Sequence, residues 1–189
     1  GLRRPKDPRL GTDVAGTVEA VGENVTQFQP GDEVFGCATG AFAEYVLSRE
    51  ANLVKKPANV TFEQAAAMPV AALTALQGLR DHGGLKPGQK VLINGASGGV
   101  GTFSVQIAKH LGAEVTGVCG TANLGMVGSL GADAVIDYTQ EDFTRICRGF
   151  DIIFDTVAKR SFATCKGSLT AKGVYLTTGP ALAPILHAL

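Results

Sequence analysis

The sequence predicts an α/β fold, in which a parallel sheet with helices on both faces is preceded by a mostly β segment. Two patterns lead to this prediction. Beyond residue 88, short apolar runs alternate with helix-like stretches, which is typical of parallel strands that are buried on both faces. Residues 12–53 instead hold short strand-like runs broken by turn residues such as Pro30 and Gly31. The chain therefore divides into a β-rich first part and an alternating second part.

The first part is expected to contain four short strands and two helices. The strands are expected at Val14–Val21, Glu33–Phe35, Ala41–Leu47 and Ala51–Val54. Thr61 and Gln64 have the spacing of a capping box, so the first helix should begin after Thr61. A second helical stretch over residues 71–82 ends at the pair Gly83-Gly84.

The second part is expected to alternate strands and helices. The apolar runs predict strands at Val91–Ile93, Val115–Val118, Ala134–Ile136, Ile152–Phe154 and Val174–Leu176. Helices are expected between most of them, at Val100–Leu111, Leu124–Leu130, Phe143–Cys147 and Phe162–Leu169. Because crossovers between parallel strands are right-handed, helices should cover both faces and a ligand crevice should lie at the carboxyl ends of the strands.

Composition and charge exclude several classes of function. The chain has 189 residues, of which 45% are hydrophobic and 18% charged, as in ordinary globular proteins. Lys and Arg number 17, and Asp and Glu also number 17, so no net field attracts nucleic acid or an anionic membrane surface. The longest apolar stretch, residues 65–79, is too short to span a bilayer. We therefore expect a small-molecule partner, no nucleic acid and no membrane.

Cysteine and histidine usage gives no metal site. The cysteines are far apart and form no Cys-x-x-Cys pair, which fits neither a zinc ribbon nor a disulfide framework and favours a cytoplasmic protein. The three histidines lie near expected helix ends or in the C-terminal tail and suggest no ligand set. These residues are Cys37, Cys119, Cys147 and Cys165, and His82, His110 and His187.

A glycine-rich turn carries the clearest functional signal. The strand that ends at Asn94 runs into Gly95–Gly101, and a helix follows directly. Glycines there permit a tight turn and let phosphate oxygens approach the main chain, while the helix N-terminus offers unpaired N–H groups. The pattern predicts a Rossmann-type dinucleotide-binding domain, with a ligand-free glycine loop as the alternative. A Walker A loop is excluded because Gly101 is followed by Thr102, without the required lysine.

The identity of the dinucleotide is open from the residues alone. An NAD site usually has an acid at the end of the second strand, where this chain reads Cys119-Gly120-Thr121. The missing acid removes a repulsion against the 2′-phosphate of NADP. However, no Lys or Arg occurs between His110 and Thr144, so the expected cation is also missing. Gly120 and Thr121 therefore form either a plain loop or a contact to the 2′-phosphate.

An ordered series of motifs resembles a known family. The motifs are Gly11–Gly16 with Val18–Gly22, Pro30–Gly36, Gly95–Gly101 and Leu130–Asp133. In these motifs the chain resembles the medium-chain dehydrogenase/reductase superfamily, and within it the zinc-free quinone oxidoreductase-like branch. The resemblance implies a partial GroES-like, mostly β substrate domain over residues 1–70, a connecting helix over 71–87 and a Rossmann domain over 88–189, incomplete at its C-terminal end. It also implies that the chain is truncated at both ends.

Departures from the zinc-dependent relatives concern the metal. Those relatives carry a Gly-His-Glu whose histidine binds catalytic zinc, and the corresponding residues here are Gly11-Thr12-Asp13. They also often carry a four-cysteine lobe, which this sequence lacks. We therefore predict that the protein holds no zinc.

The resemblance also implies site residues. It assigns the cofactor to the glycine turn, to the loop after the second strand and to the ends of the later strands. These residues are Ala96, Ser97, Gly98, Gly99, Val100, Gly101, Gly120, Thr121, Tyr138, Thr156, Thr178 and Gly179. Thr74 matches a threonine near the nicotinamide and is the one candidate catalytic residue; the catalytic residues are otherwise unknown. Structural roles remain open for four of them: strand ends for Thr156 and Thr178, a helix-carbonyl contact for Thr74 and a half-buried aromatic for Tyr138.

The implied activity is hydride transfer from NAD(P)H to a quinone or other α,β-unsaturated carbonyl, without zinc. NADPH is the more expected cofactor, although relatives often place Ser and Lys or Arg where this chain has Gly120 and Ala122. An enoyl-thioester reductase is the alternative enzyme. A non-catalytic dinucleotide-binding fragment or interaction module is the alternative of another class. We also expect a homo-oligomer, because missing segments would leave apolar surface exposed.

Overall fold

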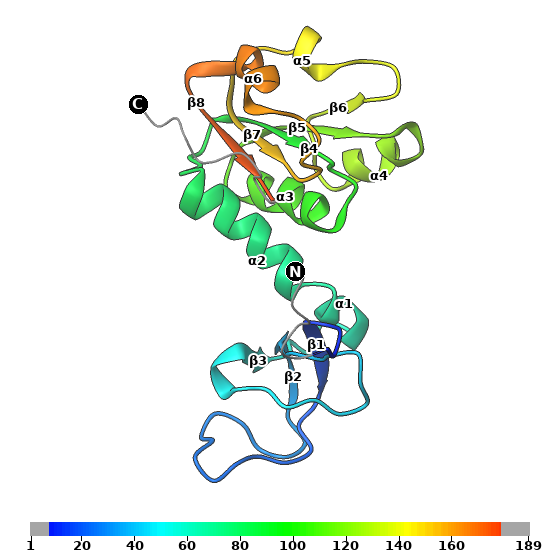
Figure 1. Cartoon of the computed structure of the whole chain (residues 1–189), viewed down its shortest axis with the longest axis vertical. Coiled ribbons are helices and arrows are strands. Elements are labelled where there is room, and N and C mark those ends of the chain that lie inside the picture. The colour runs from blue at the N-terminus through cyan, green and yellow to red at the C-terminus, as the bar shows by residue number, and fades with distance from the viewer. Residues whose placement is uncertain (1–7, 179–189) are drawn as a thin grey trace, which may run out of the picture. The chain divides into compact units, whose positions relative to one another are not determined.

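The computed structural model describes residues 8–178, and it divides the chain into two units, Gly1–Leu73 and Thr74–Leu189 (Figure 1). The first unit holds a small antiparallel sheet, and the second holds a larger parallel sheet with its helices. This confirms the predicted fold class. No helix among the described residues is both long enough and apolar enough to cross a membrane.

The first unit contains three antiparallel strands in the order β1-β2-β3. Val14 of β1 pairs with Gly36 of β2, and Phe35 of β2 pairs with Val54 of β3. Helix α1 begins after the predicted capping box, in which the Thr61 hydroxyl accepts from the amide of Gln64 and the Gln64 side chain accepts from the amide of Thr61. The elements are β1 Asp13–Thr17, β2 Glu33–Cys37, a 3-10 turn Glu50–Asn52, β3 Leu53–Lys55 and α1 Phe62–Ala66.

The prediction of a strand at Ala41–Leu47 is wrong. The segment is irregular. The amide of Ala41 donates to the Gly11 carbonyl and the amide of Phe42 to the Leu10 carbonyl, but the segment forms no strand ladder within the described residues. Phe42 is 83% exposed and Leu47 92% exposed. Apolar and aromatic residues favour a strand only where they can pair with a neighbouring strand and pack on a buried face. The described structure gives this segment no neighbouring strand, and most of its side chains are exposed.

The second unit contains five parallel strands in the order β6-β5-β4-β7-β8. The chain moves outward from β4 through β5 to β6 and then returns to the other side of β4. The strand order therefore reverses beside β4, which is where open α/β sheets bind ligands. The strands are β4 Lys90–Asn94, β5 Glu114–Cys119, β6 Ala134–Asp137, β7 Phe150–Asp155 and β8 Leu169–Thr177.

Helices lie on both faces of this sheet, as predicted. Val91 and Ile93 of β4 pack with Val105 of α3 in one buried cluster, whereas Leu92 packs with Phe143 of α5 in another. Consecutive residues of β4 thus point to opposite faces, and both faces are covered. The helices are α2 Pro69–Leu76 with a π-helical turn Gln77–His82, α3 Gly99–His110, a 3-10 turn Thr121–Asn123 with α4 Leu124–Ser129, α5 Phe143–Ile146, and α6 Phe162–Cys165 with a 3-10 turn Lys166–Ser168.

Candidate dinucleotide-binding site

The glycine turn follows the innermost strand and is fixed by main-chain bonds. The amides of Gly95 and Ala96 both donate to the carbonyl of Val118 on β5, at 3.0 Å each. Gly95 has a φ of +84°, a conformation that favours glycine, and the amide of Gly98 donates back to the Gly95 carbonyl at 3.0 Å. The turn is therefore tight and anchored to the end of β5.

Helix α3 begins on this turn with a free N-terminal end. Gly98 is its N-cap residue and provides no capping side chain. A Cβ on Gly101 would overlap the carbonyl oxygen of Gly95 and lie 2.8 Å from the Cα of Ala96, so the helix starts directly against the turn. The uncapped first-turn amides and the positive end of the helix dipole fit a diphosphate. The residues present thus suit the dinucleotide that the sequence predicts.

Two predicted site residues have their side chains engaged with protein. Ala96 is fully buried, and its methyl group faces Gly117 of β5, where a Cβ would lie 3.2 Å away. The Thr156 hydroxyl donates to the carbonyls of Asn94, at 2.9 Å, and Gly95, at 3.3 Å. Thr156 therefore positions the start of the glycine turn from the end of β7.

Thr156→Val is expected to weaken dinucleotide binding by about fivefold, the equivalent of one hydrogen bond of about 1 kcal/mol. The isosteric valine removes the hydroxyl that holds Asn94 and Gly95 but keeps the side-chain volume. Fluorescence titration with NADH measures the effect, and Thr156→Ser serves as the control that keeps the hydroxyl. Unchanged binding in Thr156→Val would show that the turn holds its shape without this contact.

A buried polar network joins the carboxyl ends of three strands, and the sequence analysis did not find it. Asp155, at the end of β7, is fully buried. Its carboxylate accepts from the Asn94 amide group at 2.8 Å, from the Tyr175 hydroxyl at 3.0 Å, and from the amides of Val157 at 3.0 Å and Ala158 at 3.1 Å. Burial, and then the Asp155 charge, raise the pKa of Tyr175 far above its usual range. The network fixes β4, β7 and β8 where the crevice opens.

Burial raises the pKa of the nearby Cys165 thiol to about 11, and the charge of Asp155 adds to the rise. The folded state therefore keeps this proton at a pH where the unfolded chain loses it. Its contribution to stability is complete below the ordinary thiol pKa and is lost as the pH rises toward 11. We expect the free energy of unfolding to fall over this range, and to fall less steeply in Cys165→Ala. Urea denaturation at several pH values measures both slopes; equal slopes would contradict the expectation.

A second group of predicted residues meets at the ends of β5 and β6. Gly120 follows β5, and a Cβ there would lie 3.3 Å from the Tyr138 hydroxyl oxygen. The Thr121 hydroxyl donates to Oδ2 of Asp137 at 2.5 Å. This hydrogen bond, and then the amide of Thr139, lower the pKa of Asp137. The structure thus brings Gly120, Thr121 and Tyr138 together and adds a carboxylate that the sequence analysis missed.

Thr74 and Thr178 line one cavity of about 290 Å³ in the second unit. Thr74 comes from α2, and Thr178 follows β8 and donates to the carbonyl of Thr156 at 3.3 Å. The Phe154 ring fills the space beside Gly78, where a Cβ would lie 2.8 Å from the ring. Gly179 lies outside the described residues. The remaining lining residues are Gln77, His82, Leu176 and Thr177.

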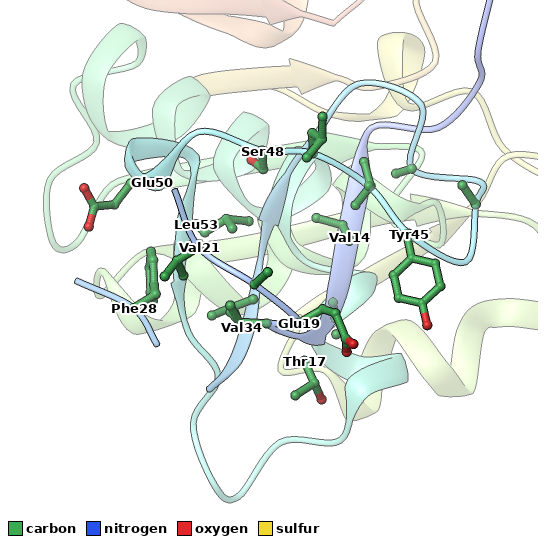
Figure 2. A pocket seen from close by; sticks show the side chains of 18 of the residues that line it. Val14, Thr17, Glu19, Val21, Phe28, Val34, Tyr45, Ser48, Glu50 and Leu53 are labelled. Carbon is green, nitrogen blue, oxygen red and sulfur yellow. The ribbon is translucent and has the colours of Figure 1, made fainter. Parts of the chain in front are cut away.

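A larger hollow of about 660 Å³ lies in the first unit and contains none of the predicted site residues (Figure 2). Val14, Val34 and Leu53 line it from the three strands. At its rim, the Glu50 carboxylate accepts from the amides of Thr26, at 2.8 Å, and Gln27. The lining mixes apolar side chains with charged ones such as Glu19 and Glu44.

The residues that replace the zinc motif have a structural contact. Oδ1 of Asp13 accepts a hydrogen bond of 2.9 Å from the amide of Val70, in the first turn of α2. Within residues 8–178, no group of three or more His, Cys, Asp or Glu side chains lies close enough together to hold a metal ion.

Two family models match the chain. An alcohol dehydrogenase GroES-like domain matches residues 2–58, and a zinc-binding dehydrogenase domain matches residues 99–185. The two matches fall in the two units of the structure and cover the antiparallel sheet and most of the parallel sheet.

Several of the curated relatives are named as oxidoreductases. The chain is 45% identical over 152 residues to the chloroplast envelope quinone oxidoreductase homolog of Arabidopsis thaliana, covering 73% of this chain and 46% of the relative. It is 43% identical over 159 residues to the mitochondrial NAD(P)H oxidoreductase RTN4IP1 of Mus musculus, covering 78% and 40%. The chain thus spans about half the length of these relatives.

Solved structures agree with this likeness. The quinone oxidoreductase of Coxiella burnetii superposes with a TM-score of 0.84 at 33% identity, covering 89% of this chain and 55% of that one. The CurK enoyl reductase also gives a TM-score of 0.84, at 31% identity, covering 89% and 53%. The two family models match in order along the chain, and the structure has both sheets and the uncapped N-terminus of α3. Together these findings show that the chain belongs to the medium-chain dehydrogenase/reductase superfamily, in its quinone oxidoreductase-like branch.

Proposed function

We propose that the protein is an NAD(P)H-dependent reductase that transfers hydride to a quinone or another α,β-unsaturated carbonyl, without zinc. The observation that carries this proposal is the uncapped N-terminus of α3 behind the Gly95 turn, beside the point where the strand order reverses. The names of the similar quinone and NAD(P)H oxidoreductases support the same chemistry.

In this proposal the chain divides its tasks. Residues 88–189 form the domain that holds the dinucleotide, and residues 1–70 belong to the substrate domain. Residues 71–87 form the helix that connects these two domains. The amides of Ser97 and of Gly99–Gly101 bind the diphosphate, and a nicotinamide cofactor, when bound, supplies the hydride. Thr74 is the candidate catalytic residue, because its cavity adjoins the end of β8 and a hydroxyl there can stabilise a developing oxyanion. Zinc has no role in this proposal, since Thr12 stands where the zinc-dependent relatives have their ligating histidine, and the next residue, Asp13, accepts the Val70 amide of α2.

The second candidate is an enoyl-thioester reductase, which the likeness to the CurK enoyl reductase favours. Both candidates share the fold and hydride transfer to a conjugated carbonyl, and they differ in the acceptor. NADPH is the cofactor favoured by the family resemblance, while the residues around Asp137 bear on the choice between NADPH and NADH.

The proposal is tested by titrating the full chain with NADH and NADPH and then following loss of nicotinamide absorbance with a quinone and with an enoyl thioester. The assays are run with and without a metal chelator. Faster turnover of the quinone, unaffected by the chelator, supports the proposal, and faster turnover of the thioester supports the second candidate. Binding without turnover of either acceptor would leave only a dinucleotide-binding module, and no binding of either dinucleotide would overturn all three readings.

A further inference from the structure

We propose that Asp137 is a specificity-determining residue that makes this chain bind NAD(H) more tightly than NADP(H). The inference rests on the proposed function and deepens it, and it departs from the NADPH preference that the family resemblance implies. A binding site for NAD usually takes its carboxylate from the end of the second strand. Here we infer that the neighbouring third strand supplies it.

The strand register places Asp137 next to the cofactor loop. Asp137 on β6 pairs with Cys119 on β5, and the amide of Tyr138 donates to the Cys119 carbonyl at 3.0 Å. The carbonyl of Val118, the residue before Cys119, accepts the amides of Gly95 and Ala96. Three neighbouring strands therefore end side by side at the carboxyl edge of the sheet. The glycine turn follows β4, Gly120 follows β5, and Asp137 ends β6. An adenosine ribose whose diphosphate lies on α3 extends in this direction.

The hydrogen bonds of Asp137 leave one acceptor position. The carboxylate offers about four lone-pair sites. Oδ1 accepts the amide of Thr139 at 2.9 Å and its hydroxyl at 2.8 Å, while Oδ2 accepts the Thr121 hydroxyl at 2.5 Å. These three donors hold the carboxylate ionised and fixed in direction. The remaining site on Oδ2 suits a ribose 2′-hydroxyl, which donates, and repels a 2′-phosphate, which cannot.

No Lys or Arg within residues 8–178 forms an ion pair with the Asp137 carboxylate, and hydrogen bonds alone lower its pKa. The sequence has no Lys or Arg between His110 and Thr144. Of the cations that flank this stretch, Lys109 pairs with Asp133 at 2.8 Å and Arg148 donates to the carbonyls of Thr144 and Cys147. A 2′-phosphate would thus meet an uncompensated carboxylate. Repulsion of this kind near a protein surface lowers affinity by about tenfold or more.

The test measures the dissociation constants of NADH and NADPH for the full chain and for Asp137→Asn. The wild type is expected to bind NADH about tenfold more tightly than NADPH, and Asp137→Asn should bring the ratio close to one, chiefly by gaining affinity for NADPH. Glu114→Gln is the matched control, because it removes the same charge at the opposite end of β5, and its ratio should equal that of the wild type.

A second measurement needs no variant. Adenosine 5′-monophosphate and adenosine 2′,5′-bisphosphate differ only in the 2′-phosphate, and the monophosphate should displace bound NADH at the lower concentration. Equal or tighter binding of NADPH by the wild type, or an unchanged ratio in a folded Asp137→Asn, would overturn the inference and leave the proposed function standing. Failure to bind either dinucleotide would overturn the proposed function itself.

Discussion

Replacing Gly101 with alanine is expected to weaken dinucleotide binding by more than about 100-fold and to lower the free energy of unfolding by about 1–3 kcal/mol. The added Cβ would overlap the Gly95 carbonyl oxygen and crowd the Cα of Ala96, and both are backbone atoms that no side-chain rotation can move aside. Relief requires α3 to shift away from the turn, so that its first amides no longer point where a diphosphate would lie. Fluorescence titration and urea denaturation measure the two effects.

Gly128→Ala is the matched control for this substitution. Gly128 lies within α4, and a Cβ there would meet nothing within 4 Å. Because alanine is favoured over glycine inside a helix, this variant should gain about 0.5–1 kcal/mol and bind the dinucleotide as the wild type does. If Gly101→Ala bound as tightly as Gly128→Ala, close packing of α3 on the turn would not be required for binding.

Asp155→Ala is expected to lower the free energy of unfolding by about 2–4 kcal/mol. The substitution leaves the buried Asn94 amide group without its acceptor and removes the acceptor of the amides of Val157 and Ala158. The Tyr175 hydroxyl keeps a second acceptor, the carbonyl of Arg160 at 2.9 Å. Unsatisfied buried donors carry their full desolvation cost, which exceeds the loss of one hydrogen bond.

Tyr175→Phe provides the comparison, because it removes only one donor from the network. It should cost about 1 kcal/mol. Urea denaturation with linear extrapolation gives both values. A loss in Asp155→Ala no larger than that in Tyr175→Phe would mean that the network does not hold the three strand ends together.

The strands of the second unit could be predicted because their sequence signal is local. Val91–Ile93 and Ile152–Phe154 are short apolar runs, and each lies within a strand that is buried on both faces. The glycine turn could be predicted for the same reason, since the strand, the turn and the helix are contiguous. The capping box of Thr61 and Gln64 likewise spans only four residues.

The features that were missed depend on neighbours distant in sequence. Asp137 carries no local sign of a role, and only the pairing of β5 with β6 brings it to Thr121, 16 residues away. Asp155 meets Asn94 across 61 residues. At Ala41–Leu47 the sequence instead predicted an element that does not form. The composition of this segment favours a strand, but the described structure places no strand beside it. Composition cannot report whether a partner strand is present.

The central claim is that the amides at the start of α3 bind a diphosphate. The most direct measurement follows the backbone amide resonances of the full chain while ADP, which carries the diphosphate without the nicotinamide, is added. We expect saturable shifts concentrated at Ser97–Gly101, and the same shifts with NADH. Binding of ADP or NADH that leaves these amides unchanged, or the absence of binding by both, would contradict the account.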